Sequence, residues 1–401
     1  MDRKKNYIIV SKDAMCTDYL RCYFPNGKCT NTPNIDELAE KGTVFTNYYA
    51  AGASTVMAFF SMCTGKYSFQ SDMQVYERKS KPYNGETLFT KLKDNGYSQL
   101  HIIWSDGWED LPEYEDYFHD DVELHTINHL RSLVVGKNVS EQSNVDEQLA
   151  EQFLNKIEKL ISDILSRGER TFIWLHLPHV IAGRAGYGSD MDLLDRYVGM
   201  VRKYFQDDEI TITADHGNMN GHRGKLAYAY DVYDPVVRIP FIRPRLGNMP
   251  VCNEYVSSTQ FYNLIFEDLI PKEKFIYSET AYKAQKHRKL AILYKGYKYI
   301  YNKADNTEEL YDMELNPEES LSLVSEQIYD PDRKIKVYIK DRYYYPKWKE
   351  SHEAYKVLRD EKDRIWQNGD FKYVLQEFLK SKMRPLKDAY IQFKFLAHDN
   401  F

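Results

Sequence analysis

Acidic and histidine residues follow two apolar runs, where they could bind a metal ion. Asp13 comes after the apolar run at residues 7–10. Asp215 and His216 are adjacent and come after a second run, which ends at Thr213. Open α/β sheets bind ligands at the carboxyl ends of their strands, and carboxylates with imidazole suit a divalent ion such as zinc or manganese. One strand-terminal Asp-His pair alone is more often a structural hydrogen-bonding pair, so the metal-site interpretation depends on both strand ends.

A threonine within a run of small residues is the candidate nucleophile. Thr55 lies in the segment AGAST at residues 51–55, ahead of an apolar run that ends at Cys63. At a helix N-terminus, free N–H groups and the helix dipole would stabilise an alkoxide and an anionic ester. The simpler alternative is that Ser54 or Thr55 is an ordinary N-cap. Taken alone, the segment favours the cap.

Short β-rich runs alternate along the chain with segments of helical period, which predicts an α/β core with helices on both faces of a sheet. The predicted strands are residues 7–10, 99–104, 171–175 and 209–213. The predicted helices are residues 33–40, 85–93, 145–165 and 191–204. This arrangement would place Asp13 and Asp215 at strand ends.

The character of the sequence changes near residue 291, where two short β-rich runs flank a turn at Gly296. We therefore expect a catalytic α/β domain over residues 1–290 and a small C-terminal β-rich subdomain over residues 291–330. Residues 331–401 are rich in Tyr and Lys and are expected to form a mainly helical extension, with helices at 351–366 and 371–381.

Composition excludes several classes of function. With 401 residues and 43% apolar content, the chain can bury a large core. Its 60 acidic and 54 basic residues are interleaved, which gives no footprint for nucleic acid and no polybasic membrane arm. No signal peptide and no span of eighteen apolar residues are visible. The five cysteines lack zinc-ribbon spacing. These features predict a cytoplasmic protein without a membrane span.

Four motifs in order along the chain resemble the sulfatase-like family of the alkaline phosphatase superfamily. TPNIDELAEKGTVFTNYYA at residues 32–50 resembles the family pattern TPNLDxLAxxGxxFxNxYA. TGKY at 64–67, DHG at 215–217 and ELYDMELNPE at 309–318 resemble later family motifs. The resemblance runs from about residue 7 to 322. It implies an alkaline phosphatase-like fold, with a large mixed sheet between helices and a smaller C-terminal α+β subdomain.

The resemblance places the family's nucleophile position on Thr55. Sulfatases proper carry a cysteine or serine there, in the pattern C/S-x-P/A-x-R, which matures to formylglycine. The segment TVMAF at residues 55–59 has none of these residues. A threonine resembles the phosphoryl-transferring branches, such as phosphoglycerol and phosphoethanolamine transferases and phosphodiesterases, where it forms a covalent phosphoenzyme. Phosphorus chemistry is therefore favoured over sulfate hydrolysis.

One metal site of the family is implied in full, by Asp13, Thr55, Asp215 and His216. The segment at residues 176–184 resembles the HxPH segment of sulfatases and transferases, and not the ligands of a second ion. Ala14 stands where sulfatases usually carry a second acid. We therefore expect one divalent ion, with zinc or manganese preferred over calcium or magnesium.

Further residues receive roles from the same resemblance. His222 is the candidate general acid for the leaving group, and Lys225 acts with it in catalysis. The candidate substrate-binding residues, which would neutralise charge on the ester, are His176, His179 and Arg223. Taken singly, a loop histidine is more often a surface or packing residue, and Lys225 a solvated charge.

These residues together predict a metal-dependent hydrolase of phosphate or sulfate esters of a small molecule or glycan. The ion would lower the pKa of Thr55, which attacks in line and leaves a covalent intermediate. The alternatives are a phosphoryl-alcohol transferase to a glycan or lipid, a sulfuric ester hydrolase, and an inactive binding relative. The alcohol part of the ester and the oligomeric state stay open.

Overall fold

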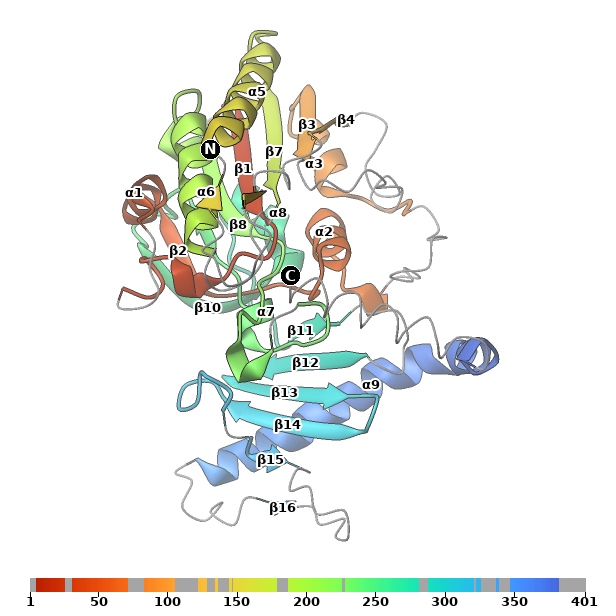
Figure 1. Ribbon diagram of the computed structural model, residues 1–401. Coiled ribbons are helices and arrows are strands. Elements are labelled where there is room, and N and C mark those ends of the chain that lie inside the picture. Colours follow the sequence, from red (N-terminus) through yellow and green to blue (C-terminus); the bar gives the residue numbers. More distant parts are fainter. Residues whose placement is uncertain are drawn as a thin grey trace.

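The computed structural model describes residues 5–25, 31–70, 83–104, 122–127, 134–135, 144–145, 147–178, 187–225, 228–280, 288–320, 322–325, 337–338 and 347–381. A large sheet with helices on both faces occupies one end of the molecule, and a small antiparallel sheet occupies the other (Figure 1). The predicted α/β fold with a smaller C-terminal subdomain is confirmed.

The large sheet has eight strands in the order β10-β2-β9-β8-β1-β7-β3-β4. Their bounds are β1 Tyr7–Lys12, β2 Thr43–Tyr49, β3 Gln99–Trp104, β4 Val122–Thr126, β7 Thr171–Leu177, β8 Ile210–Ala214, β9 Phe241–Arg243 and β10 Val251–Ser257. Strand β9 runs antiparallel to both β8 and β2, whereas the other pairs are parallel, so the sheet is mixed as predicted. All four predicted strands are present within two residues of their expected ends.

Helices cover both faces of this sheet (Figure 1). The first face carries α1 (Pro33–Lys41), α5 (Glu147–Leu165) and α6 (Tyr187–Val201). The second carries α2 (Thr55–Thr64), α3 (Leu88–Asp94) and α8 (Phe261–Phe266). Helix α6 begins four residues before its predicted start and ends at Val201, and α5 begins at Glu147, because residues 144–145 belong to a short strand.

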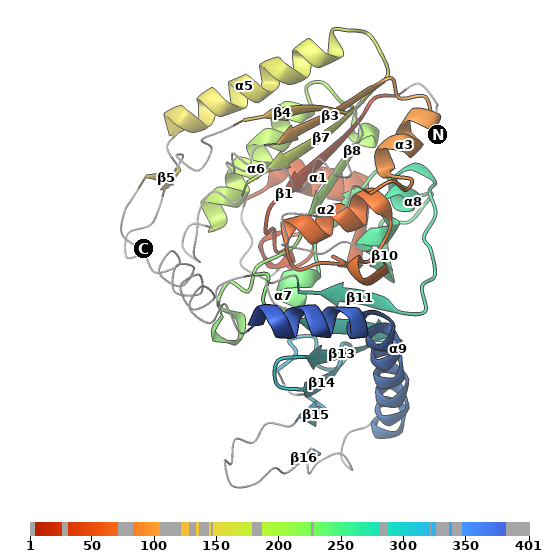
Figure 2. The ribbon, with the colours of Figure 1, turned by 90° about the vertical axis from the view of Figure 1, so that its right-hand side faces the viewer.

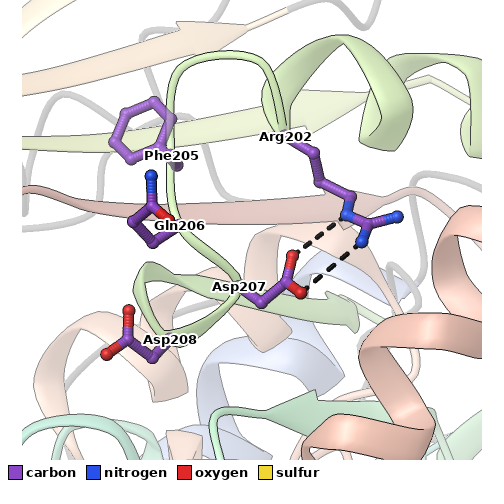
Figure 3. A pocket seen from close by; sticks show the side chains of 5 residues that line it. All are labelled: Arg202, Phe205, Gln206, Asp207 and Asp208. Carbon is purple, nitrogen blue, oxygen red and sulfur yellow. Dashed lines mark hydrogen bonds and ion pairs between the residues drawn. The ribbon is translucent and has the colours of Figure 1, made fainter.

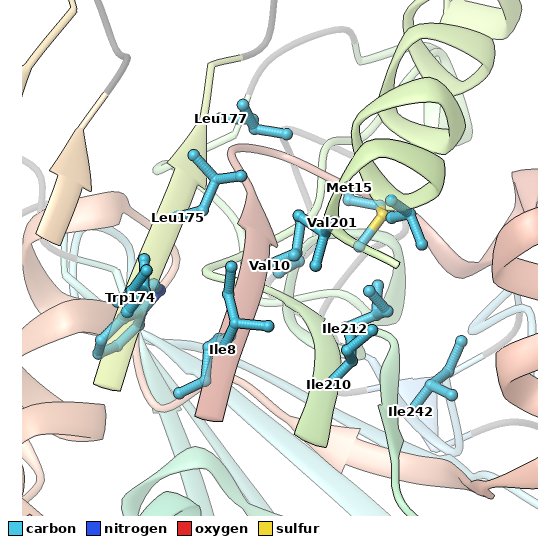
Figure 4. Close-up of a cluster of buried hydrophobic side chains, with 14 of the residues drawn as sticks. Ile8, Val10, Met15, Trp174, Leu175, Leu177, Val201, Ile210, Ile212 and Ile242 are labelled. Atoms are coloured by element: carbon cyan, nitrogen blue, oxygen red, sulfur yellow. The ribbon is translucent and has the colours of Figure 1, made fainter. Parts of the chain in front are cut away.

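The core lies on both sides of the central strands, which explains why the first four positions of β1, Tyr7 to Val10, are apolar. All six residues of β1 are buried. Val10 is paired with Leu175 of β7, and Val201 of α6 lies near them (Figure 4), whereas Trp174 stacks on Phe59 of α2 on the other face. A strand buried in this way has little freedom to shift its register, so the residue that follows it is held in place.

The small sheet contains four antiparallel strands in sequence order: β11 (Ile276–Glu279), β12 (Lys289–Tyr294), β13 (Tyr297–Asn302) and β14 (Thr307–Asp312). The predicted turn at Gly296 joins β12 and β13, and both of its central residues have positive φ. The expected subdomain boundary at residue 291 falls inside β12. The sheet begins earlier because β11 pairs with β12.

One long helix, α9 (Trp348–Ser381), takes the place of the two predicted C-terminal helices. It packs against β12 and β13, where Leu358 joins Leu290 and Tyr299 in a buried apolar cluster (Figure 2). The remaining short elements are β5 (Val134–Val135), β6 (Asn144–Val145), α7 (Asp234–Val237), β15 (Val324–Ser325), β16 (Val337–Tyr338) and the 3-10 turns Thr17–Tyr19, Ser68–Gln70, Asp207–Glu209, His222–Gly224 and Ser258–Gln260.

Within the described parts of the chain, every helix is too short or too polar to cross a membrane. Four of the five cysteines, Cys16, Cys22, Cys63 and Cys252, are described, and each is a free thiol.

A buried ion triad joins the small sheet to the large one. Lys298 of β13 has no exposed side-chain surface, and its Nζ lies 2.7 Å from Asp234 Oδ1 and 2.7 Å from Glu319 Oε1. Asp234 begins α7, between the two sheets (Figure 1). Burial raises the pKa of Glu319 to about 7, since one lysine serves two buried carboxyl groups.

Replacing Lys298 with methionine should destabilise the fold by about 3–5 kcal/mol, because the buried Glu319 would lose its cation and Asp234 would be left with Arg238 at 3.4 Å. The matched control is Lys203→Met, which removes an exposed pair with Glu158 and should cost less than about 1 kcal/mol. Urea unfolding of both variants measures the two costs. Equal losses would contradict the role given to the triad.

Glu319 should also make stability depend on pH. Its folded-state pKa of about 7 lies above the ordinary value of 4.5, so the folded state holds the proton more tightly than the unfolded state. That contribution is complete below about pH 4.5 and is lost as pH rises through about 7. We expect the melting temperature of Glu319→Gln, measured against the wild type by calorimetry, to improve between pH 5 and pH 8. A difference that does not change with pH would disprove this.

Candidate active site

Two neighbouring parallel strands bring the predicted metal ligands together. Lys12, the last residue of β1, is paired in register with Ala214, the last residue of β8. Asp13 and Asp215 therefore leave the sheet side by side. The Nε2 atom of His216 lies 3.4 Å from Asp13 Oδ1 and 3.5 Å from Asp215 Oδ2, and all three side chains are buried. The ligand atoms of the three residues lie within 4.8 Å of one another.

The tautomer of His216 suits metal binding. Its Nδ1 lies 2.8 Å from the carbonyl oxygen of Gly217, and a carbonyl oxygen can only accept, so Nδ1 carries the proton. The lone pair of Nε2 then faces the two carboxylates. A backbone carbonyl that fixes the ring in this way is the usual support for a metal-binding histidine.

One carboxylate oxygen of Asp215 accepts hydrogen bonds from the backbone, and the other could bind a metal ion. Its Oδ1 accepts the N–H groups of His216 at 2.7 Å and of Ala14 at 3.1 Å. Its Oδ2 is buried and makes no hydrogen bond to the described residues. Burial raises the pKa of Asp215 to about 6, although His216 acts in the opposite direction. Ala14 has a φ of 56°, and such backbone strain in a non-glycine residue is typical of functional sites.

Close backbone packing requires the glycine of the DHG motif. A Cβ on Gly217 would lie 2.1 Å from the carbonyl oxygen of Pro235, so no side chain fits there. The Cys16 thiol fastens the same loop, since it donates to the carbonyl of Asn218 at 3.2 Å and accepts from Asn220 Nδ2 at 3.4 Å. The loops after β1 and β8 are thereby held against each other.

Thr55 is the first residue of α2 and faces the same cluster. Its Oγ1 lies 3.2 Å from His216 Nε2. Ser54 occupies the N-cap but makes no side-chain capping bond, and its buried Oγ makes no hydrogen bond to the described residues. The cap interpretation therefore lacks its expected contact. The hydroxyl of Thr55 stands where the free N–H groups of α2 would attract an anion.

The small sheet supports the segment that leads to Thr55. The N–H of Ala53 donates to the carbonyl of Glu279 at 2.9 Å, and the N–H of Glu279 donates to the carbonyl of Ala51 at 3.1 Å. Glu279 is the last residue of β11. The segment before Thr55 is thus hydrogen-bonded to the edge strand of the C-terminal sheet.

The donor set fits a single divalent ion. Two carboxylates, one imidazole nitrogen with a lone pair and one hydroxyl converge, and Asp215 keeps an oxygen that no hydrogen bond uses. Nitrogen with oxygen ligands suits zinc or manganese. The structure brings together Asp13, Thr55, Asp215 and His216, the residues expected to form this site.

The predicted catalytic residues His222 and Lys225 lie on the loop after the DHG motif and are each ion-paired. His222 Nε2 lies 2.9 Å from Asp18 Oδ2, and Asp18 belongs to the loop that follows Asp13. The ammonium group of Lys225 lies 2.8 Å from Asp231. Both roles stay predictions.

Arg223, predicted to bind substrate, contacts the C-terminal part of the protein. Its guanidinium lies over the Tyr233 ring at 4.3 Å and donates to the Tyr311 hydroxyl at 3.4 Å and to the carbonyl of Glu319. His179, the other predicted substrate ligand on a loop, lies outside the described residues.

His176 has no exposed surface with which to contact a substrate. Its ring packs between Phe59, at 4.8 Å, and Trp104, at 4.5 Å. Its Nδ1 lies 2.8 Å from Ser11 Oγ, and burial lowers its pKa to about 3. The ring therefore stays neutral and belongs to the wall beneath the site.

Tyr228 is a site residue that no sequence motif indicates. Its ring lies 4.3 Å from the His216 ring, tilted by 33°. Asp18 and Asp231, the partners of His222 and Lys225, are also absent from the predicted set. Tyrosine is common throughout this chain, so only the folded structure distinguishes this one.

A surface depression of about 430 Å³ lies before the N-terminal end of β8 (Figure 3). It is lined by Arg202, Phe205, Gln206, Asp207 and Asp208. These residues directly precede β8, whereas Asp215 follows it, and Arg202 is already paired with Asp207 at 3.0 Å. The depression shares no residue with the candidate site.

A model of the sulfatase family matches residues 5–265. Arylsulfatase D of Homo sapiens is 32% identical to the chain over 115 residues, which are 29% of this chain and 16% of the human protein. The match therefore spans only a small part of that relative's length.

Two solved structures show the same fold. One is a protein in complex with its substrate D-glucosamine-2-N,6-O-disulfate, with a TM-score of 0.59 and 14% identity, covering 92% of this chain and 99% of that one. The other is the phosphonate monoester hydrolase of Agrobacterium radiobacter, with a TM-score of 0.62 and 13% identity, covering 80% of this chain and 91% of that one.

Asp215→Asn should remove one bound divalent ion per chain, because a neutral amide replaces a ligand whose Oδ2 faces His216 Nε2. The matched control is Asp207→Asn in the surface depression, which should leave the metal content unchanged. Elemental analysis after loading with zinc and dialysis measures both. Equal metal content in the two variants would refute the assignment.

Proposed function

Because the chain belongs to the sulfatase family, we propose that it is a metal-dependent ester hydrolase with Thr55 as its nucleophile. One observation carries the proposal: Thr55 Oγ1 lies 3.2 Å from His216 Nε2, beside two buried carboxylates and at the N-terminus of a helix. A hydroxyl in such surroundings can be activated for attack on an anionic ester.

Asp13, Asp215 and His216, with Thr55, would hold the ion. When bound, a divalent ion lowers the pKa of a coordinated hydroxyl and offsets the negative charge of the ester. Thr55 Oγ then forms a bond to phosphorus while the bond to the alcohol breaks, and the hydroxyl proton passes to solvent. Water later attacks the phosphothreonine and restores the free hydroxyl.

His222 is the proposed proton donor to the departing alcohol. Its ring is paired with Asp18, which belongs to the loop that follows Asp13 and orients the imidazole. Lys225 is held by Asp231 near the same loop and would offset charge on the ester. Both side chains are partly exposed, as groups that meet a substrate must be.

We favour phosphate esters as the substrate class. The side chain of Thr55 offers a single hydroxyl and cannot form the aldehyde hydrate of formylglycine, whereas a threonine ester of phosphate is an ordinary covalent intermediate. Sulfate esters, of a small molecule or a glycan, are the second candidate. The similarity to human arylsulfatase D and the fold shared with a protein that binds a sulfated sugar favour it.

Thr55→Ala should lower turnover of the best ester by about 10³-fold or more, because the nucleophile is lost. Thr64→Ala is a matched control, since Thr64 ends the same helix and its hydroxyl bonds only to the neighbouring backbone. Paired aryl phosphate monoester, phosphodiester and sulfate substrates should be assayed with zinc or manganese present, with and without an acceptor alcohol.

Phosphate turnover that requires Thr55, with a phosphoryl group trapped on its peptide after acid quenching, is the expected result. Turnover of the sulfate alone would favour the second candidate, and turnover that needs the acceptor would indicate a transferase. Undiminished activity of Thr55→Ala would end the assignment of the nucleophile.

A further inference from the structure

A second group of metal-binding side chains lies at the outer edge of the large sheet. His101 of β3 is paired in register with Glu123 of β4, the edge strand, and His125 follows Glu123 on the same face of that strand. One ligand atom from each residue lies within 4.8 Å of the others. Two imidazoles and a carboxylate are a ligand set that zinc commonly takes.

The spacing of the ligand atoms matches a tetrahedral ion. Bonds of about 2.0–2.1 Å in a tetrahedron place the ligand atoms about 3.3 Å from one another. His101 Nδ1 lies 3.1 Å from His125 Nε2 and 3.4 Å from Glu123 Oε2, and His125 Nε2 lies 3.5 Å from Glu123 Oε1. The two Glu123 distances involve different oxygens, so the carboxylate would have to turn for the three side chains to share one ion.

Hydrogen bonds around Gln99 set the tautomer of His101. Its amide nitrogen donates to Glu169 at 2.8 Å, and Arg167, which can only donate, lies 3.0 Å from its Oε1. The Oε1 atom must therefore accept from His101 Nε2, at 3.2 Å. The Nδ1 atom of His101 is left with a lone pair directed at His125 and Glu123, as a metal ligand requires.

The tautomer of His125 would change when an ion binds. Because His101 Nδ1 has a lone pair, its 3.1 Å hydrogen bond with His125 Nε2 requires the proton to be on His125 Nε2. Movement of that proton to Nδ1 would turn Nε2 into a ligand atom.

We propose that His101, Glu123 and His125 form a zinc site that fastens the edge strand β4 to β3. The Glu123 side chain is 47% exposed, which leaves the fourth position open to water. Arg167, just after α5, donates to Glu123 Oε2 at 2.9 Å and orients the carboxylate from outside. Its positive charge opposes the ion only weakly, because the Arg167 side chain is 43% exposed and screened by solvent.

This edge site is separate from the candidate active site. His101 is level across the sheet with Ile173 of β7 and Ile8 of β1, whereas Asp13 follows the end of β1. Trp104 packs on Phe59 of α2, and His101, three residues earlier in the same strand, points to the opposite face. The edge site therefore does not depend on the proposed ester hydrolysis.

The test counts zinc ions in the full chain, in four single variants and in one double variant after loading and dialysis. His125→Ala and Glu123→Gln each remove a ligand of the edge site, and Asp215→Asn removes one of the active site. Asp207→Asn is the control, because it lies in the surface depression and belongs to neither cluster. We expect two ions in the wild type and the control, one in each of the other variants, and none when His125→Ala and Asp215→Asn are combined.

Zinc affinity of the Asp215→Asn protein should fall more than about 100-fold when His125→Ala is added, because even outer partners of a metal site contribute about 10- to 100-fold. Cobalt bound to the Asp215→Asn protein should show the intense visible absorption of a tetrahedral site and lose it with His125→Ala. Equal zinc content with and without His125 would overturn the edge site. Loss of zinc with His125 but not with Asp215 would support the edge site and contradict the metal assignment at the active site.

Discussion

The register between two parallel strands determines most of what this protein can do. Lys12 and Ala214 are partners at the last rung of β1 and β8, so Asp13 and Asp215 emerge together. Both carboxyl groups are buried, and separation of two such charges from water is unfavourable unless a cation or hydrogen bonds compensate. The N–H groups of Ala14 and His216 compensate only in part. A positive ion at that position, as proposed above, would supply the remaining compensation.

The two candidate metal clusters differ in how far their carboxyl groups are buried. At the end of β8 the ligands are fully buried, and one of them, Asp215, has its pKa raised by burial. At the edge strand, solvent and Arg167 keep Glu123 ionised. A buried site favours chemistry on a bound ester, because electrostatic interactions are stronger away from water. A half-exposed site on an edge strand suits a structural ion. Such an ion would also hinder pairing of the edge strand with strands of other chains.

Sequence patterns were sufficient for the strands and the cluster at their ends, because the period of apolar residues and the position of Asp13 are local properties. The position of Thr55 alone favoured an ordinary N-cap, and its role was predicted only from the family resemblance. The partners of Arg223 could not be predicted, since they come from the small sheet, from the segment after it and from the residue that precedes α7. The burial of the His176 ring could not be predicted, because pleat direction decides exposure. Its role in substrate binding stays a prediction, since the predicted metal ligands are equally buried. The edge cluster was invisible, since only the pairing of β3 with β4 brings His101 to Glu123.

Two backbone hydrogen bonds between Glu279 and the segment before Thr55 attach that segment to the small sheet. The proposed metal ligands follow strands of the large sheet, whereas the segment before Thr55, the proposed nucleophile, is also hydrogen-bonded to the small sheet. Opening of β11–β14 and α9 would therefore release Thr55 while Asp13, Asp215 and His216 kept their places. A partly opened molecule of this kind would still bind the proposed ion but would not catalyse ester hydrolysis. The measured metal content would then overestimate the fraction of active molecules.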